Sequence, residues 1–399
     1  MEAETISSLI GEITSLGQHI DAKSRQLLQK KVQDLSYALE TPGDTVQRVA
    51  YLPLRTAGVR TAMNLNLYKK LVDAGDGATP EELAKGTEAD PKLLERILRY
   101  CTAIGTMGQK ENGKFYATNI SKAMIMPLLE AGIKHTFDSC GPAFMKMPEY
   151  LAKNKYQQPV NPMDCPFQMA FNTDLHLFPW FMAPEQSEKL DFFNTWMAGS
   201  REGRNDWYEF YPVETNLFKG FSTEKDGVMF VDVAGGRGHE IKAFRKKFPD
   251  APGRYILQDL PETVAQVDKS ETDFEPTAYD FFTPQPIHGA RFYYFRQVMH
   301  DWPDDKCIEI LKNTVASMKP GYSRIIINDM VVADVGAGVV PTQLDLLMLS
   351  MCASQERTES SWRQLIPAAG LKLVKIWTLE EGVESIIECT LAEEEGLPN

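Results

Sequence analysis

The chain has 399 residues, enough for two or three packed units that each bury a core. A hydrophobic content of 43% and a charged content of 24% are typical of a globular protein, and a net charge of −13 argues against a nucleic-acid-binding surface, which needs clustered positive charge. No apolar run approaches the roughly 18 residues that span a membrane, and Glu2 and Glu4 replace the basic start of a signal peptide, so we expect a cytoplasmic protein.

Residues 1 to about 70 are predicted to form helices with an apolar stripe. A first helical pattern ends at Thr41-Pro42-Gly43, and a second runs from 44 to about 70. The apolar positions are Ile6, Leu9, Ile10, Ile13, Leu16, Leu27, Leu28, Val32, Leu35, Val46, Val49, Leu52, Val59, Met63 and Leu67. Such stripes need a partner surface to cover them.

The segment from 79 to 118 has the order helix, turn, helix, hairpin. Thr79-Pro80-Glu81-Glu82 is a capping box with proline at the first helical position, and Asp90-Pro91 opens a second helix in the same way. Asn112-Gly113 predicts the turn of a β-hairpin between Gly108 and Thr118. This is a winged-helix order, for which DNA binding and a dimerisation platform are both interpretations. The basic residues of the second helix are only Lys92, Arg96 and Arg99. A dimerisation platform is therefore favoured.

Residues 121 to about 214 are predicted to be helical, with proline and glycine breaks, and are rich in aromatic and methionine side chains. Much of this set must be ordinary core. A surplus of soft, adaptable side chains is also what a pocket for a flat hydrophobic substrate uses. We expect this pocket to involve the aromatic and methionine residues between Phe137 and Met197, together with Met348 and Met351.

From about 215 onward strands alternate with helices, which predicts a doubly wound α/β sheet. The strands are predicted near 228–233, 254–259, 275–280, 291–296, 324–332, 371–378 and 383–391. The link Glu380-Glu381-Gly382 is too short for a parallel crossover, so the last two strands should form an antiparallel hairpin.

A glycine-rich loop follows the first of these strands, with the spacing Asp232-x-Ala234-x-Gly236-x-Gly238. Glycines let a backbone approach a ligand closely, and the following helix offers unpaired N–H groups, although a loop of this kind can also be a plain tight turn. Asp259 follows Gly238 by 21 residues at the end of the next strand, where a carboxylate binds a ribose diol. The acid-first spacing lacks the last glycine of a dinucleotide loop, so S-adenosylmethionine (SAM) is favoured over NAD.

A further acid, Asp280, precedes Phe281-Phe282, which offers an apolar face for an adenine ring. The run from Arg296 to Asp305 reads R-Q-V-M-H-D-W-P-D-D. With the glycine loop and Asp259-Leu260-Pro261, these motifs resemble the caffeic-acid type of small-molecule O-methyltransferase, in a fungal natural-product version. The resemblance covers nearly the whole chain.

The resemblance implies SAM as methyl donor and S-adenosylhomocysteine as product, a small hydrophobic substrate, and a homodimer formed through the N-terminal helices. The cofactor-binding residues that it and the loop suggest are Asp232, Gly235, Gly236, Gly238, Asp259, Leu260, Asp280, Phe281 and Arg296. It places Phe193 and Met197 on a helix that closes over substrate and cofactor, and Arg201 near the amino-acid end of SAM. Ala234 stands where the family usually has glycine, which is acceptable if its φ is negative.

His300 is the candidate general base, because it lies at a strand-to-helix corner that points into the expected crevice. Methyl transfer from a sulfonium requires a deprotonated oxygen held close to the methyl carbon. The family places acids around the base at the positions of Asp329 and Glu356, with Asp329 in place of a longer glutamate. This arrangement requires no metal, and the six cysteines lack the spacing of a zinc site.

The expected architecture therefore has three parts: a helical and winged-helix dimerisation domain (1–120), a helical linker and substrate-pocket segment (121–214), and a Rossmann-like SAM-binding methyltransferase domain with a mixed seven-stranded sheet (215–399). The favoured function is an O-methyltransferase for an aromatic or polyketide-type hydroxyl. The alternative is a SAM-binding pericyclase of the leporin-forming type on the same scaffold, which would use His135 as a polar donor, with Arg201 and Arg296 near the ligand. A winged-helix regulator is disfavoured by the acidic charge balance.

Overall fold

The computed structural model describes residues 2–199, 205–222, 227–268, 273–380 and 382–392. The chain divides into two compact units, Met1–Ile125 and Met126–Asn399. Within the described residues no helix is both long and apolar enough to cross a membrane.

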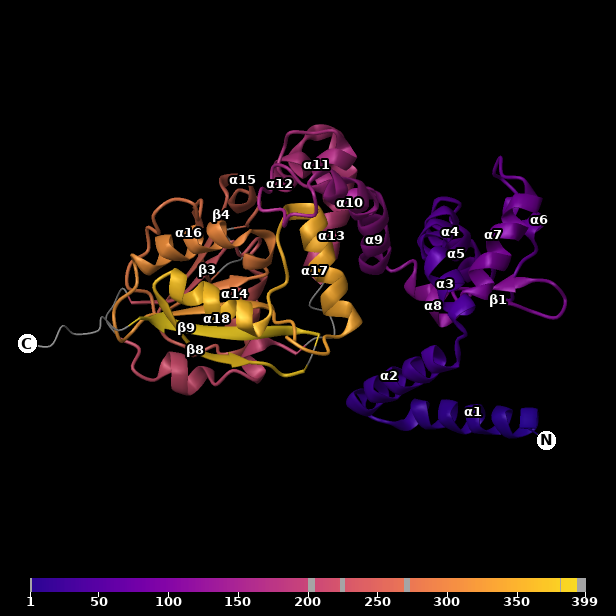
Figure 1. The fold of residues 1–399 in the computed structure, drawn as a ribbon, viewed down its shortest axis with the longest axis horizontal. Helices are drawn as coiled ribbons and strands as arrows, with labels where there is room; N and C mark the ends of the chain where they lie inside the picture. The colour runs from indigo at the N-terminus through magenta and orange to yellow at the C-terminus, as the bar shows by residue number, and fades with distance from the viewer. Residues whose placement is uncertain (1, 200–204, 223–226, 269–272, 381, 393–399) are drawn as a thin grey trace, which may run out of the picture. The chain divides into compact units, whose positions relative to one another are not determined.

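The first unit is helical apart from one small hairpin (Figure 1). Its elements are α1 (Glu2–His19), α2 (Ala22–Leu39), α3 (Pro42–Ala50), α4 (Leu52–Asn64), α5 (Leu67–Ala74), α6 (Pro80–Ala84), α7 (Pro91–Ala103), β1 (Gly108–Gln109), β2 (Phe115–Tyr116) and α8 (Asn119–Ala123). The predicted capping box at Thr79 is present, because its side chain accepts the N–H of Glu82 at 3.2 Å while the carboxylate of Glu82 accepts the N–H of Thr79 at 2.8 Å. The winged-helix order is confirmed by these elements.

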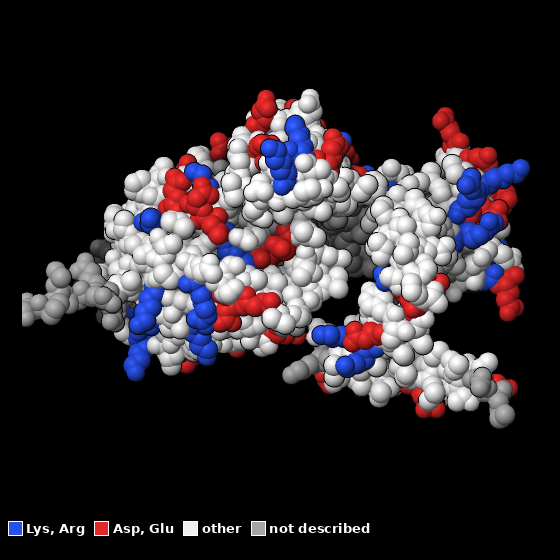
Figure 2. Space-filling model, viewed as in Figure 1, with Lys and Arg blue, Asp and Glu red and all other residues white. Residues whose placement is uncertain are grey.

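The apolar side chains of α1 and α3 are largely exposed among the described residues. Ile6, Leu9 and Ile10 of α1 are 57%, 52% and 58% exposed, and α3 has no buried residue. The visible face of the winged-helix unit mixes acidic with basic residues and carries no uniform basic surface (Figure 2).

The second unit begins with helices that make up most of the predicted substrate segment. They are α9 (Pro127–His135), a π-helical turn η1 (Thr136–Cys140), α10 (Gly141–Lys153), α11 (Pro166–Phe171), α12 (Leu177–Met182), η2 (Pro184–Gln186), α13 (Ser187–Gly199), η3 (Trp207–Glu209) and η4 (Glu214–Phe218). Rings and aliphatic side chains of α11, α12 and α17 share one buried cluster.

A mixed seven-stranded sheet forms the centre of the second unit, with strand order β5-β4-β3-β6-β7-β9-β8. The strands are β3 (Val228–Val233), β4 (Arg254–Asp259), β5 (Glu275–Ala278), β6 (Phe292–Arg296), β7 (Arg324–Met330), β8 (Leu371–Trp377) and β9 (Glu384–Leu391). The helices between them are α14 (His239–Lys247), α15 (Pro261–Val264), η6 (Met299–Asp301), α16 (Asp304–Val315), α17 (Val339–Cys352) and α18 (Glu359–Ala368). Strands β3 to β7 are parallel to one another, whereas β9 pairs antiparallel with β7 and β8. The predicted fold class and terminal hairpin are confirmed.

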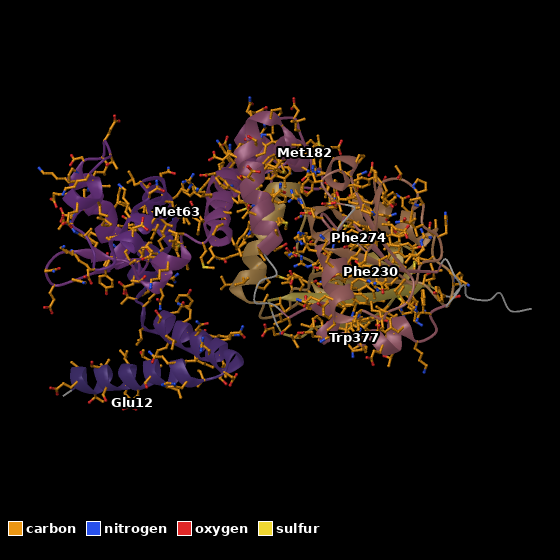
Figure 3. All side chains as sticks on the ribbon, turned by 180° about the vertical axis from the view of Figure 1, so that it is seen from behind. Glu12, Met63, Met182, Phe230, Phe274 and Trp377 are labelled. Carbon is orange, nitrogen blue, oxygen red and sulfur yellow. The ribbon has the colours of Figure 1, made fainter. Side chains whose placement is uncertain are left out.

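Two apolar clusters cover the two faces of the sheet, as a doubly wound sheet requires. On one face Tyr293 and Ile327 pack against α16 and α18. On the other, Phe230 and Tyr294 pack against α14 and the segment around Trp207. Phe230 and Phe274, which belong to this second cluster, are labelled in Figure 3. Because successive residues of a strand point to opposite faces, Asn328 and Asp329 at the end of β7 lie on different faces of the sheet, and Asn328 donates to the hydroxyl of Tyr294 at 2.8 Å.

Candidate active site

The glycine loop between β3 and α14 is too crowded for side chains. A Cβ on Gly235 would lie 2.4 Å from the carboxylate carbon of Asp232, and one on Gly238 would lie 2.5 Å from the ring of Phe274. Gly236 and Gly238 also have φ values of +60° and +77°. Replacement at these positions would therefore displace the loop.

Ala234 does not have the negative φ that would make alanine acceptable there. Its φ is +58°, in the left-handed region, where an L-residue other than glycine is strained by about 1 kcal/mol. The condition for an acceptable alanine is therefore not met at this position, directly after the end of β3 at Val233.

Asp259 lies at the end of β4, beside this loop. Its Oδ2 accepts the N–H of Gly236 at 2.8 Å, and its Oδ1 accepts the N–H of Leu260 at 2.8 Å. Burial raises the pKa of Asp259, against the opposite effect of these two N–H donors. The carboxylate is thus held in place at the predicted ribose position.

The other predicted cofactor residues follow the neighbouring strands. Asp280 is exposed and accepts the N–H of Phe282 at 3.0 Å. The ring of Phe281 lies 5.9 Å from that of Trp302. Arg296, at the end of β6, lies between two acids, with ion pairs of 3.4 Å to Glu240 and 3.2 Å to Glu384.

The central feature of the site is the hydrogen bond between His300 and Glu356. His300 lies on η6 after β6, and its Nδ1 is 2.8 Å from Oε1 of Glu356, which is 5% exposed in the loop between α17 and α18. Because a carboxylate can only accept, Nδ1 carries the proton and Nε2 of the neutral ring is an acceptor. That Nε2 lies 3.6 Å from Oδ1 of Asp301.

Asp329, at the end of β7, is buried on the same face of the sheet without reaching His300 by a hydrogen bond. Neither of its carboxylate oxygens has a partner among the described residues. Burial raises the pKa of Asp329 to about 7, and His300 acts in the opposite direction. Burial also raises the pKa of Asp301, to about 6.

His300 responds to this ring of acids. Burial alone would lower its pKa, but the carboxylates of Asp301, Glu356 and Asp329 outweigh that effect and raise the pKa to about 10. The cluster therefore stabilises an imidazolium strongly, and the fraction of neutral His300 that can accept a proton grows as the pH rises toward 10.

Two residues of this cluster, Asp301 and Arg357, were missed in the sequence. Asp301 could have been recognised because it follows His300 directly. Arg357, which is 1% exposed, follows Glu356 and donates to the turn that carries His300. Buried arginines are rare unless paired, but burial at this position is not visible in the sequence.

The predicted substrate residues gather only in part. His135, at the end of α9, is 8% exposed; its ring lies 5.5 Å from that of Phe193 and its Nε2 3.5 Å from Sγ of Cys140. Its Nδ1 has no partner among the described atoms, and burial lowers its pKa to about 4. Met351 is buried in the cluster that Phe193 adjoins. Met348 on α17 is half-buried and Met197 on α13 is 37% exposed, while Arg201 lies outside the described residues.

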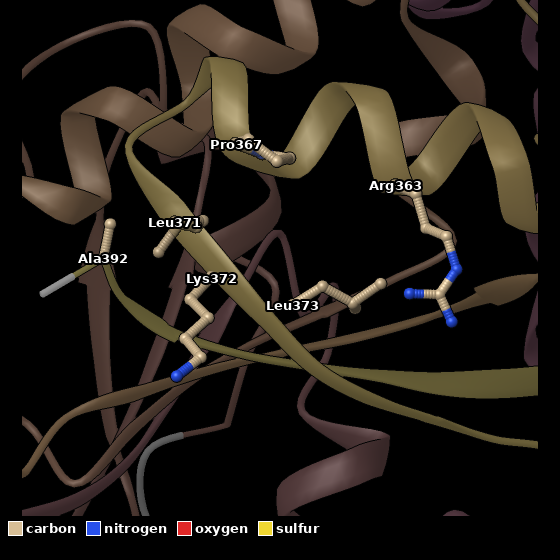
Figure 4. A pocket seen from close by; sticks show the side chains of 6 residues that line it. All are labelled: Arg363, Pro367, Leu371, Lys372, Leu373 and Ala392. Atoms are coloured by element: carbon tan, nitrogen blue, oxygen red, sulfur yellow. The ribbon is translucent and has the colours of Figure 1, made fainter.

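A surface cleft of about 450 Å³ lies elsewhere, between α18 and the edge strand β8 (Figure 4). Its lining residues are Arg363, Pro367, Leu371, Lys372, Leu373 and Ala392. None of the predicted site residues is among them, so this cleft is not the candidate active site.

Two family models match this chain. Residues 214–372 match the O-methyltransferase domain family, and residues 54–126 match the O-methyltransferase dimerisation domain. The O-methyltransferase mpaG of Penicillium roqueforti is 34% identical over an alignment of 401 positions, which covers 98% of this chain and 100% of that protein.

A second relative and two solved structures are also similar to nearly the whole chain. The O-methyltransferase lepI of Aspergillus flavus is 35% identical over 376 residues, which are 94% of this chain and 96% of that protein. The structure of LepI in complex with SAM has a TM-score of 0.88 and covers 98% of this chain and 100% of that one. A pericyclic reaction enzyme has the same TM-score of 0.88 at 34% identity, with 98% of this chain and 100% of that chain covered.

Proposed function

Because this chain belongs to the O-methyltransferase family, we propose that it transfers the methyl group of SAM to a hydroxyl of an aromatic or polyketide-type secondary metabolite. His300 is the general base, assisted by Glu356 and Asp329. The observation that carries this proposal is the 2.8 Å hydrogen bond from Nδ1 of His300 to Glu356 beside the buried Asp329. It leaves Nε2 to receive the proton of the acceptor hydroxyl.

The residues at the ends of β3 and β4 fit SAM. Gly235 and Gly238 leave no room for a Cβ, so the tight loop requires glycine at both positions. Asp259 beside this loop offers a fixed carboxylate for a ribose diol. Asp232, Gly236, Leu260, Asp280, Phe281 and Arg296 are proposed to complete the cofactor site. SAM supplies a methyl group on a sulfonium, an electrophile that needs no metal for activation.

The protein supplies the base and its setting. Glu356 fixes the ring of His300 and stabilises the imidazolium that forms when Nε2 takes the hydroxyl proton. Asp329, when ionised, adds negative charge near the ring of His300 without a hydrogen bond to it. Segment 121–214 is proposed to hold the substrate, with Phe193, Met197, Arg201, Met348 and Met351 near the acceptor.

The assembly and location are part of the same proposal. The family model for residues 54–126 is a dimerisation domain, and the exposed stripes of α1 to α3 supply apolar surface for a second copy of the chain. We propose a homodimer through these helices, a cytoplasmic location, and no nucleic-acid partner.

A second candidate function is a SAM-bound pericyclase, in which His135 and Arg296 act on the substrate by hydrogen bonding. The observation that favours it is the buried Nδ1 of His135, which has no partner among the described residues. The similarity to a pericyclic reaction enzyme at a TM-score of 0.88 also supports it.

One experiment separates the two functions. SAM labelled in its methyl group is incubated with a metabolite extract of the source organism and either wild-type protein or His300→Ala. Label in a product that the variant no longer forms, while the variant still binds SAM, supports methyl transfer with His300 as base. Products that are isomers or dehydrated forms of an extract component, without label, support the pericyclase.

A further inference from the structure

Arg357 is a buried arginine whose guanidinium reaches both ends of the turn that carries His300. Its Nη1 donates to the carbonyl of Met299 at 2.7 Å, and its Nη2 donates to the carbonyl of Trp302 at 2.8 Å. Its Nε donates to Oδ1 of Asp304 at 2.8 Å, at the start of α16. The guanidinium carbon also lies 5.4 Å from the ring centroid of Trp362 on α18.

The turn depends on such outside donors. The 3₁₀ turn η6 is only three residues long, so it satisfies few of its own carbonyls. Ser354 Oγ donates to the carbonyl of Trp302 at 2.8 Å, and Sγ of Cys307 lies 3.2 Å from both carbonyls that Arg357 binds. Arg357 is the one charged donor in this set, and charged donors make the stronger hydrogen bonds.

The dipeptide Glu356-Arg357 is itself anchored to two elements. The N–H of Glu356 donates to Oδ1 of Asp345 on α17 at 3.0 Å, and the carbonyl of Arg357 accepts the N–H of Val332, just beyond β7, at 3.0 Å. Neighbouring residues thus hold His300 from two sides, because Glu356 binds its ring and Arg357 binds the backbone around it.

We propose that Arg357 is a positioning residue for His300, which fixes the backbone from Met299 to Trp302 so that the imidazole meets Glu356 and presents its other nitrogen to the substrate. The use of this geometry in methyl transfer rests on the proposed function. The positioning itself does not, and it can be measured without a substrate.

A positioning role and a purely electrostatic role predict opposite changes in the titration of His300. The charged groups that act on the ring are the acids Asp301, Asp329 and Glu356. The guanidinium of Arg357 acts on the neighbouring carboxyl of Asp329. Loss of a cation alone would raise the pKa of His300 further. Loss of the turn geometry would lengthen the bond to Glu356 and lower that pKa toward its ordinary value.

The test measures the NMR titration of the full-length protein labelled with carbon-13 at Cε1 of its histidines. The chain has six histidines and so gives few resonances, and His300→Gln assigns that of His300. The variants are Arg357→Lys, which keeps the charge but cannot span three acceptors, and Arg357→Met, which removes both. Ser354→Ala, a milder change, removes one donor to the same carbonyl in case the arginine variants fail to fold.

The matched control is Arg291→Lys. Arg291 is also a buried arginine, 6% exposed, that donates to the carbonyls of Leu217 at 2.7 Å and Tyr322 at 2.7 Å. It precedes the amino end of β6, whereas His300 follows the carboxyl end. Loss of stability without any change at His300 is expected for this variant.

We expect the pKa of His300 to fall by at least about one pH unit in Arg357→Lys and by less in Ser354→Ala. The fall should also be smaller in Arg357→Met, where loss of the cation acts in the opposite direction. With a methyl acceptor, kcat should fall about 10- to 100-fold in Arg357→Lys with little change in SAM binding. An unchanged His300 titration in Arg357→Lys, or an equal shift in Arg291→Lys, would overturn the proposal. A shifted titration in a protein that transfers no methyl group would instead contradict only the proposed function.

Discussion

Asp329 and His300 share one buried cluster, yet Asp329 contributes no hydrogen bond to the imidazole or to any other described residue. A buried carboxylate without a donor is costly to ionise, and burial accordingly raises its pKa to about 7. The acid is thus retained at the expense of stability, which is typical of residues that serve a reaction.

Asp329→Asn should therefore stabilise the fold while it slows methyl transfer. The raised folded-state pKa of Asp329 means that its contribution to stability is fully present below about pH 4 and is lost as the pH rises toward 7. The variant should gain on the order of 2–4 kcal/mol in free energy of unfolding above pH 8 and little at pH 4. Urea unfolding at both pH values measures this, with Asp250→Asn on the surface as control. A loss of stability at pH 8 would contradict the prediction.

The rate of methyl transfer should rise with pH well beyond neutrality. His300 must be neutral to accept a proton, and the surrounding acids raise its pKa to about 10. Glu356→Gln removes one of these acids, so its pH–rate profile should begin to rise at lower pH, while its maximal rate falls because the ring is less well held. The measurement is kcat/KM between pH 6 and 10. If kcat/KM rises at the same pH in the wild type and in Glu356→Gln, His300 is not the group whose deprotonation controls the rate.

Strand pattern and spacing were enough to predict the sheet, because buried parallel strands such as Val228–Val233 are continuous apolar runs and the short link before β9 permits only an antiparallel pair. The strand β5 ends earlier than expected, at Ala278, and its Pro276 is tolerated because β5 is an edge strand.

The site was predictable where it depends on local motifs and not where it depends on distant contacts. The crowding at Gly235 follows from a motif within a few residues. The bond from Arg357 to Met299 joins residues 58 positions apart, and the failure of Asp329 to reach His300 depends on the length of one side chain in a folded core. Neither can be read from residue type, since both are properties of packing.

Ala234→Gly should stabilise the protein. Ala234 has φ +58°, which glycine adopts without strain, and relief of that strain should exceed the greater chain entropy that glycine loses on folding. We expect a gain of about 0.5–1 kcal/mol in free energy of unfolding. Ala316→Gly is the matched control, because Ala316 has φ −59° and should lose a similar amount. Equal effects of the two substitutions would contradict the strain at Ala234.

Protonation of His176 should weaken the fold in mild acid. Its ring stacks on Trp302 at 4.9 Å, and burial lowers its pKa to about 4. Because this folded pKa is depressed, the stability it contributes is present above about pH 6.5 and is lost as the pH falls toward 4. His176→Phe keeps a ring against Trp302. Between pH 7 and pH 4.5 its melting temperature should therefore fall less than that of the wild type. The exposed His288→Phe serves as control in the same thermal melts, and a matching response would refute the role of His176.

Charge placed on the N-terminal helices should break the proposed dimer. Ile10 and Leu16 of α1 are 58% and 56% exposed, and an apolar stripe of this kind in water favours contact with a second copy. Ile10→Glu with Leu16→Glu should leave a folded species of half the mass in sedimentation or light scattering, because a buried carboxylate at an apolar interface costs several kcal/mol. Val374→Glu changes an equally apolar residue, 46% exposed on the edge strand β8, and should leave the mass unchanged. If the double variant kept the wild-type mass, the interface would have to lie on another surface, with the winged-helix unit next to be tested.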